Sequence, residues 1–399
     1  MRIAQINSYS NGSTGHIART IHTALLEQGH ESLFAFGAGP DIGPEGYRIE
    51  TRVGGFLHTL TTLFTGLHGY SSVAATRRLV RRLKAFQPDL IHLHNLHGNY
   101  LNLKILFRYL KKADIPVVMT AHDCWIFTGK CYHYYEAKCD KFLHQCGHCP
   151  QLAMYPKSYC FDRTKKMLAD KKKWIGALDN VHMVTISQWL QGEVGKSMLG
   201  RYPITIVRNC VNPAYGVTSV SADLLDKYGL RDKCVILGVA SSWNEHKGTR
   251  DFCALAERLA QDEVIVLVGH MKDDVVLPPK VITIPRTDSV EELAQLYNAA
   301  SVYVSMSTEE TFGLTIAEAL CCGTPAVVYD ATACPEMVQT GHNGFAVAPH
   351  DVEQVYVCIQ QIKDGRVADR VTISEQARGQ YTAQRMADEY LVVYKGVLA

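Results

Sequence analysis

The 399-residue sequence has no apolar run that is long enough, and free enough of charge, to cross a bilayer. Its first residues, MRIAQINSYSNG, lack the basic, apolar and small-residue order of a secretory signal. The net charge is only +2. We therefore expect a cytoplasmic protein without a transmembrane segment and without nucleic acid among its partners.

Two catalytic fingerprints are also missing. The first strand-to-helix loop, NSYSNGSTGHIART, carries Gly12 and Gly15 open to a pyrophosphate, but not in G-x-G-x-x-G spacing. This makes an oxidoreductase the least favoured enzyme class. No D-x-D motif is present to clamp a metal ion.

The sequence does contain two series of short apolar, β-branched runs separated by helix-length segments. Such runs indicate parallel sheets covered on both faces, so we expect an α/β protein with two Rossmann-like, doubly wound domains facing an interdomain cleft. Charge supports the division, because residues 1–195 carry 23 Lys/Arg against 14 Asp/Glu, and the remainder carries 18 against 25. The runs lie at residues 2–7, 90–95, 115–120, 182–187 and 204–209, then at 235–240, 264–269, 281–285, 302–306 and 325–330.

The stretch STEETFGLTIAEALCCGTP (residues 307–325) sets two glutamates eight positions apart around a helix start. Glu310 precedes the predicted helix, where its carboxylate can accept hydrogen bonds from a polyol. Glu318 lies within the helix between apolar residues, and a buried carboxylate needs a donor partner. Gly313 permits close backbone approach, and the first N–H groups of the helix form an anion site. Upstream, Lys247 follows a strand in a Lys-Gly turn and can neutralise a phosphate.

The ordered set of motifs resembles the retaining nucleotide-sugar glycosyltransferases of the GT-B fold, specifically glycosyltransferase family 4. The resemblance covers essentially the whole chain. Within the family, the chain is similar to enzymes of bacterial exopolysaccharide and O-antigen assembly. It rests on the Gly-rich first loop, PDLIHLHN (88–95), TAHD (120–123), VRNCVN (207–212), the Lys-Gly turn and the E-x7-E pair.

The resemblance implies specific roles for these residues. Glu310 and the backbone of Phe312, Gly313 and Leu314 are expected to hold the donor sugar, with Glu318 on the ribose hydroxyls. Lys247 is expected on the diphosphate, and His122 beside the anomeric centre, although a strand-end histidine is more often only a satisfied core residue. Catalysis is thus assigned to His122, Glu310 and Lys247, without a cofactor. Donor binding is assigned to Lys247, Glu310, Phe312, Gly313, Leu314 and Glu318, together with Gly12 and Gly15 of the first loop.

One position departs from the family pattern. Relatives usually carry an arginine five positions before the lysine, where this chain has Ser242. Either Lys247 acts with the helix N-terminus alone, or another cation such as Arg250 or Arg208 substitutes for the arginine. Arg250 lies three positions after Lys247 and could reach the phosphates, and a surface role is at least equally consistent with its position.

The resemblance also assigns the domains. We expect an acceptor-binding domain at residues 1–205 with a Cys-rich insertion at 124–160, a donor-binding domain at 206–380, and a final helix at 381–399 that packs back on the first domain. The insertion contains Cys131, Cys139, Cys146 and Cys149, ending in C-x2-C. Either these thiols bind a structural zinc ion, or they are reduced and packed.

A basic segment, TRRLVRRLKAF (residues 76–86), follows 23 residues without Lys, Arg, Asp or Glu. Either this segment lies on the anionic inner surface of the cell membrane, or it is a half-buried helix with a solvated basic face.

The sequence therefore predicts a retaining, metal-independent hexosyltransferase that uses a nucleoside-diphosphate sugar and a saccharide or lipid-linked saccharide acceptor in cell-surface polysaccharide synthesis. A GT-B sugar-nucleotide epimerase and a catalytically weak GT-B scaffold are the alternatives.

Overall fold

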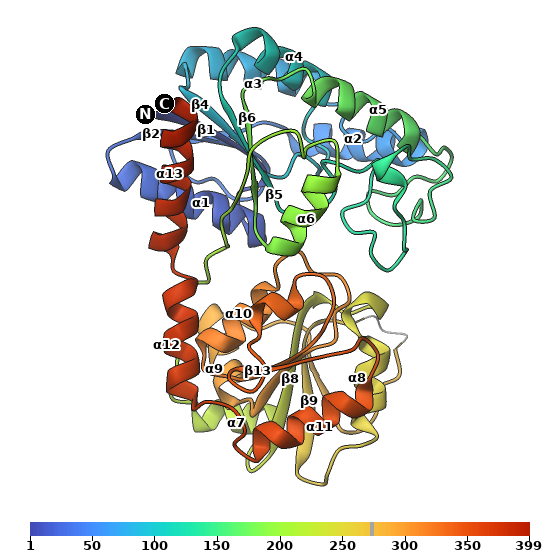
Figure 1. Cartoon of the computed structure of the whole chain (residues 1–399), viewed down its shortest axis with the longest axis vertical. Coiled ribbons are helices and arrows are strands. Elements are labelled where there is room, and N and C mark those ends of the chain that lie inside the picture. The colour runs from blue at the N-terminus through green and yellow to red at the C-terminus, as the bar shows by residue number, and fades with distance from the viewer. Residues whose placement is uncertain (272–274) are drawn as a thin grey trace. The chain divides into compact units, whose positions relative to one another are not determined.

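The computed structural model describes residues 1–271 and 275–399. The chain forms two compact units (Figure 1): unit 1 comprises Met1–Arg208 and Met386–Ala399, and unit 2 comprises Asn209–Arg385. The predicted boundaries lie at 205/206 and 380/381.

Unit 1 is built on a seven-stranded parallel sheet in the order β3-β2-β1-β4-β5-β6-β7. Chain order reverses between β1 and β4, so the carboxyl ends of these two strands form the switch point at which such sheets bind ligands. The strands are β1 (Arg2–Tyr9), β2 (Glu31–Ala38), β3 (Gly46–Arg48), β4 (Leu90–Leu93), β5 (Val117–Ala121), β6 (Val181–Thr185) and β7 (Ile204–Ile206). The helices are α1 (Gly12–Glu27), α2 (Arg52–Thr65), α3 (Val73–Phe86), α4 (Leu103–Ala113), α5 (Thr164–Ile175), α6 (Gln188–Lys196) and α13 (Ala383–Leu398).

Unit 2 repeats the plan with a six-stranded parallel sheet in the order β10-β9-β8-β11-β12-β13, and its switch point lies between β8 and β11. The strands are β8 (Cys234–Ser242), β9 (Glu263–His270), β10 (Val281–Ile284), β11 (Val302–Ser305), β12 (Ala326–Tyr329) and β13 (Gly344–Val347). The helices are α7 (Ala222–Tyr228), α8 (Thr249–Ala256), α9 (Val290–Ala299), α10 (Leu314–Cys321), α11 (Val352–Lys363) and α12 (Arg370–Gln380), with short 3-10 turns η2 (Glu245–Lys247) and η3 (Cys334–Met337).

The hydrophobic pattern explains these elements. The central strands β4, β5, β11 and β12 are buried at every position, as expected for strands covered on both faces. Helix α4 buries Leu103, Leu106, Phe107 and Leu110, which share one face at helical spacing, and Asn102 caps it by accepting a hydrogen bond from the Ile105 N–H at 3.1 Å.

The last helix packs on the sheet of unit 1. The Tyr394 hydroxyl lies 2.7 Å from Nδ1 of His92 in β4, and the Tyr390 hydroxyl lies 3.1 Å from Thr120 Oγ1 in β5. Both tyrosines are fully buried. Helix α13 therefore begins in unit 2 and completes the core of unit 1.

The segment between β5 and α5 is long and has little regular structure apart from the 3-10 turn η1 (Lys141–Leu143). Two buried lysines hold it. Lys171 Nζ, from α5, donates to the carbonyls of Trp125 and Thr128 at 2.5 and 3.0 Å. Lys130 Nζ donates to three carbonyls of residues 151, 152 and 154. The backbone of this loop is thus tied down by ammonium groups.

Helix α3 contains the predicted basic segment. Leu79 and Leu83 of this helix are buried, whereas Val80 and Phe86 are half-buried. Among the described residues, no helix has the length and apolar character needed to cross a membrane.

Replacing Lys171 by Met is expected to destabilise unit 1 by about 1–3 kcal/mol, because the two carbonyls lose their donor inside the fold. Calorimetry should show a lower melting temperature. Lys173→Met, on the exposed side of the same helix, is the control and should leave the melting temperature unchanged. Equal melting temperatures for both variants would contradict the conclusion that Lys171 holds the loop between β5 and α5.

Candidate functional site

In unit 2, an ion pair spans the switch point. Lys247 ends η2 after β8, and its Nζ lies 2.5 Å from Glu310 Oε1 in the loop after β11. Nζ also lies 3.4 Å from Ser307 Oγ. Both charged side chains are about one-quarter exposed, at 28% and 22%, so a ligand can reach them. The structure thus brings together two of the predicted residues.

The turn after Lys247 requires glycine. Gly248 has φ +78°, and an added Cβ would lie 2.3 Å from Met306 Cβ. This close approach places η2 directly against the end of β11.

Glu310 is positioned through its backbone. Its N–H donates to Thr332 Oγ1 at 2.9 Å, and its carbonyl accepts from the Ala333 N–H at 3.2 Å. The loop that carries the carboxylate is therefore fixed to the loop that follows β12.

The predicted anion site lies at the start of α10. Gly313 is the N-cap residue at φ +90°, and its carbonyl accepts from the N–H groups of Ile316 and Ala317. The N–H groups at the beginning of any helix lack partners within it, and Leu314 begins α10. Phe312 is buried with its ring edge-on to Tyr381 at 6.0 Å, which anchors the loop before the helix.

Glu318 lies one turn further along α10 and is half-buried. It accepts a hydrogen bond from the Tyr297 hydroxyl at 2.9 Å. Burial raises the pKa of this carboxyl to about 7, and the Tyr297 hydrogen bond opposes the shift only in part. The carboxyl group thus has the predicted hydrogen-bond donor, and its proton equilibrium lies near neutrality.

The two residues considered for phosphate support have different surroundings. Ser242 is exposed at the end of β8, where it pairs in register with His270. Arg250 Nη2 lies 3.4 Å from Glu245 Oε1, and both side chains are largely exposed, at 80% and 74%.

In unit 1, the glycines of the first loop differ from each other. Around Gly12, at φ +72°, an added Cβ would meet nothing within 4 Å. At Gly15 an added Cβ would lie 2.8 Å from the Ser10 carbonyl carbon, so this glycine lets α1 pack against the end of β1. Gly12 faces open space and Gly15 closes the turn.

His122 follows β5 and is buried. Its Nε2 lies 3.0 Å from His94 Nδ1, and the two rings are stacked at 5.3 Å. Burial lowers the pKa of His122 to about 4, against the raising effect of Asp123. The imidazole is therefore neutral at physiological pH.

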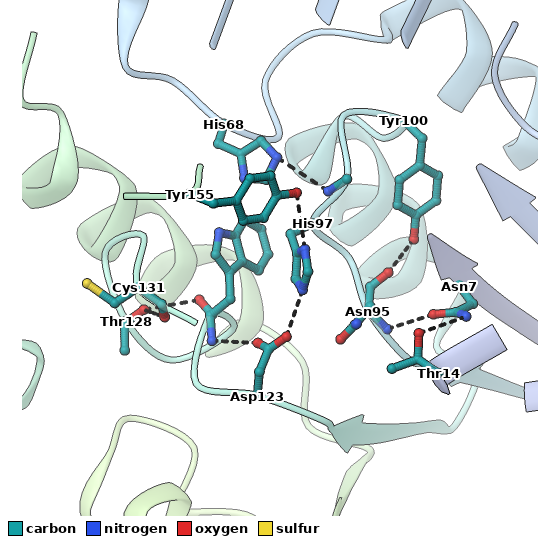
Figure 2. A network of polar contacts seen from close by, with 12 residues as sticks. Asn7, Thr14, His68, Asn95, His97, Tyr100, Asp123, Thr128, Cys131 and Tyr155 are labelled. Atoms are coloured by element: carbon teal, nitrogen blue, oxygen red, sulfur yellow. Dashed lines mark hydrogen bonds and ion pairs between the residues drawn. The ribbon is translucent and has the colours of Figure 1, made fainter. Parts of the chain in front are cut away.

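A second histidine was not predicted. His97, in the loop after β4, places Nε2 2.7 Å from Asp123 Oδ2, and the other oxygen of Asp123 accepts from the Trp125 N–H at 2.8 Å (Figure 2). His97 Nδ1 lies 3.4 Å from the hydroxyl of Tyr155, which comes from the Cys-rich loop. The His97 contact contributes to lowering the pKa of Asp123 against the cost of burial. The only sequence signal was a histidine soon after a predicted strand end.

A cavity of about 360 Å³ lies beside this network at the carboxyl ends of β1 and β2. Tyr9 and Tyr155, which are 48% and 41% exposed, present aromatic surface there. Arg48 and Arg52 also line it. Glu50 lines it as well, so the cavity combines aromatic rings with hydroxyl groups and charges of both signs, a lining that suits a polar saccharide.

The four predicted zinc ligands lie in the same loop. Cys131 and Cys149 are within hydrogen-bonding contact of each other, and this shared proton raises the pKa of the Cys131 thiol and lowers that of Cys149 to about 7. In the ranges 1–271 and 275–399, no three metal-ligating side chains converge on a common point.

Family models match both units. Residues 14–215 match the model "Glycosyltransferase Family 4", and residues 233–364 match "Glycosyl transferases group 1".

Individual relatives agree with these matches. WcaC of Escherichia coli K12, a candidate glycosyl transferase of colanic acid biosynthesis, is 24% identical over the full length of both chains. O-antigen chain mannosyltransferase B of Escherichia coli is 42% identical over 71 residues, or 18% of each chain.

Solved structures share the fold. Sucrose-phosphate synthase from Thermosynechococcus elongatus superposes with a TM-score of 0.71 at 16% identity, covering 100% of this chain and 99% of that one. Anabaena HepE in complex with UDP-glucose gives 0.69 at 16% identity, covering 99% and 100%. Two parallel-sheet units with these neighbours confirm the predicted GT-B fold.

Glu318→Gln should make the protein more stable above pH 7 than the wild type. The folded-state pKa of about 7 lies above the ordinary value of 4.5. Folding therefore retains a proton between these values, and wild-type stability falls as pH rises through this window. Glutamine removes the cost of ionisation, about 1–3 kcal/mol.

Melting temperatures from pH 4.5 to 8 test this expectation. The difference between variant and wild type should be near zero at the acid end and reach a plateau above pH 7. Glu375→Gln, exposed on α12, is the control and should show no such profile. A difference independent of pH would contradict the assignment.

Proposed function

We propose, starting from the fact that this chain belongs to glycosyltransferase family 4, that this glycosyltransferase transfers a hexose-type sugar from a nucleoside-diphosphate sugar to a saccharide acceptor with retention of anomeric configuration. The observation that carries the proposal is the Lys247–Glu310 pair beside the start of α10, with Glu318 one turn further on. In this arrangement Lys247 and the start of α10 suit a diphosphate, Glu310 suits a sugar, and Glu318 suits a ribose.

The donor is proposed to bind by exchange of partners. The diphosphate takes Lys247 from Glu310, and the freed carboxylate accepts hydrogen bonds from the sugar hydroxyls. The first N–H groups of α10 supply further positive potential to the phosphates. Glu318 accepts hydrogen bonds from the ribose hydroxyls, either in place of the hydrogen bond from Tyr297 or in addition to it.

The proposed transfer involves no change of oxidation state and therefore needs no redox partner. The bond between the anomeric carbon and the diphosphate oxygen breaks, and the acceptor hydroxyl oxygen bonds to the same face of that carbon. The acceptor proton passes to the departing phosphate oxygen. Charge that develops on the leaving group is stabilised by Lys247 and the start of α10. No step is assigned to a metal ion, so we expect activity in the presence of EDTA.

The acceptor is proposed to bind unit 1. His97, held by Asp123, and the hydroxyl of Tyr155 offer hydrogen bonds beside the 360 Å³ cavity. His122 is neutral and can donate to or accept from a sugar hydroxyl without repelling the oxocarbenium-like centre. The names of WcaC and the O-antigen mannosyltransferase support a cell-surface polysaccharide as product.

The proposed setting is the cytoplasm, at the inner face of the cell membrane. A lipid-linked saccharide acceptor requires the enzyme to reach the membrane surface. The basic helix α3 is the predicted contact, because its exposed arginines attract anionic lipids.

A structural zinc ion on Cys131, Cys139, Cys146 and Cys149 is a separate proposal. It is supported by the C-x2-C spacing and by the contact between Cys131 and Cys149. Lys130 and Lys171 lie near these thiols and would offset the negative charge of four thiolates. The sulfurs would have to draw together on metal binding.

Substitutions in the donor site should separate chemistry from binding. Glu310→Ala and Lys247→Ala are expected to lower kcat by about 100- to 1,000-fold, since each removes a group that acts on the transferring sugar or leaving group. Glu318→Ala should mainly weaken donor binding. Arg258→Ala, an exposed residue of unit 2, is the control.

The measurement begins with thermal-shift screening of UDP, GDP, ADP and dTDP sugars. Calorimetry then gives donor affinity, and nucleoside diphosphate release with bacterial membranes as acceptor source gives turnover, with EDTA present. Wild-type kinetics for both glutamate variants would refute the site. Donor conversion without acceptor would instead indicate an epimerase, and binding without turnover a scaffold.

Metal analysis tests the zinc proposal. Protein purified without chelator should contain about one zinc per chain, and Cys146→Ser with Cys149→Ser should lose it. Cys160→Ser, an exposed cysteine of the same loop, should retain it. Zinc-free protein with four reactive thiols would show that the cysteines are simply reduced and packed.

A further inference from the structure

Unit 1 has a groove far larger than its saccharide-sized cavity, and no step of glycosyl transfer uses it. The groove has a volume of about 790 Å³ and lies between α3 and α4, which pack side by side (Figure 1). Its apolar lining includes Val80, Leu83, Ile105 and Tyr109. Leu83 is buried, and the other three are half-buried.

Cations surround this apolar floor. Five basic side chains line the groove, all are exposed, and no carboxylate is among the lining residues: Arg77, Arg81, Lys84, Arg108 and Lys112. In the described part of the chain, none of the five forms an ion pair within 4.0 Å.

The nearest acids along the chain are engaged elsewhere. Asp89 Oδ2 accepts from the backbone N–H of Arg2 at 2.7 Å, and Asp114 Oδ1 accepts from Asn180 Nδ2 at 3.1 Å. Within the described residues, neither carboxylate forms an ion pair with a cation of the groove, so an anionic ligand would supply the close counter-charge that these cations lack.

The basic surface continues onto the next helix. A second groove of about 740 Å³ shares Arg108 and Lys112 with the first and reaches α5. Lys104 and Lys173 add positive charge there, while Lys166 is paired with Asp170 at 2.7 Å. Cationic side chains therefore cover adjoining parts of α3, α4 and α5.

A ligand for the first groove must combine an anionic group with an apolar chain. An acyl chain can cover the floor while a phosphate contacts the arginines, which suits an anionic phospholipid. The backbone of a nucleic acid would satisfy the cations but leave the apolar floor exposed to water.

A second, independent observation favours a bilayer. Helix α2 exposes a row of large apolar side chains at helical spacing: Val53, Phe56, Leu57 and Phe64, which are 56–69% exposed. An apolar helix face without cover is stable at a membrane interface, where lipid takes the place of water.

We propose that unit 1 binds anionic phospholipid, with the lipid phosphate on Arg81 and Arg108 and an acyl chain segment along the α3–α4 groove, while α2 rests in the interface. The proposal deepens the proposed function in naming the surface that delivers the enzyme to a lipid-linked acceptor. Donor binding by unit 2 does not depend on it.

Vesicle flotation tests the groove against mere surface charge. The wild type should float with vesicles of equal parts phosphatidylglycerol and phosphatidylcholine, and stay behind with phosphatidylcholine alone. Arg81→Ser with Arg108→Ser should weaken binding about tenfold or more. Arg78→Ser with Arg82→Ser, the same charge change on exposed α3 residues outside the groove, should weaken it about threefold or less.

A third variant addresses the kind of partner. Phe56→Ser with Leu57→Ser should weaken vesicle binding without changing the charge. Equal losses from both arginine pairs, or flotation unaffected by the α2 variant, would overturn the proposal, as would tighter binding to an oligonucleotide than to the vesicles. Melting temperature and affinity for the nucleoside-diphosphate sugar found by the thermal-shift screen should stay at wild-type values in every variant, so a failure of the lipid site is distinct from a failure of the donor site.

Discussion

The free energy needed to take a charged group out of water governs the arrangement of this protein. Lys171 is fully buried. Burial lowers the pKa of its amino group to about 7, and two carbonyls of the Cys-rich loop accept its hydrogen bonds. Glu318 meets the same cost with one hydroxyl donor and a raised pKa. Lys247 and Glu310 meet it by pairing with each other. The same requirement thus fixes a loop in unit 1 and pairs the charged groups of the proposed donor site in unit 2.

The doubly wound sheets decide where these groups gather. In unit 2, η2 follows β8 and the Glu310 loop follows β11, which are adjacent strands that begin opposite halves of the sheet. In unit 1, the loops after β4 and β5 bring His97 to Asp123. Parallel strands end at one edge, so residues distant in sequence meet there without any special local motif.

Much of the architecture was predictable from the sequence because buried parallel strands read as continuous apolar runs. Three strands were not predicted from the sequence, because they lack a continuous β-branched run. Strand β2 (ESLFAFGA) reaches its buried state through aromatic and small residues rather than a β-branched run, while β3 and β13 are short and glycine-led. Glu310 and Lys247 could be predicted as site residues because motif order marks them, and the structure adds the distance between them.

Other parts of the site depend on tertiary packing that no local pattern encodes. His97 is defined by its contact with Asp123, and Tyr155 by a loop whose course is set by buried lysines. Lys171 itself reads in sequence as one of three consecutive lysines on a helix. Only the fold reveals which of the three is buried, because helical rotation turns its neighbours toward solvent.

The Lys247–Glu310 contact has a consequence for an enzyme that works among cellular anions. In the ligand-free protein, the carboxylate acts as a tethered competitor for the ammonium group, present at the high effective concentration of a group on the same chain. A free inorganic anion offers Lys247 little that Glu310 does not already give. A donor that supplies a diphosphate for the lysine and hydroxyls for the released glutamate satisfies both partners at once. In the proposed mode of donor binding, the pair therefore selects ligands by requiring two replacement contacts instead of one.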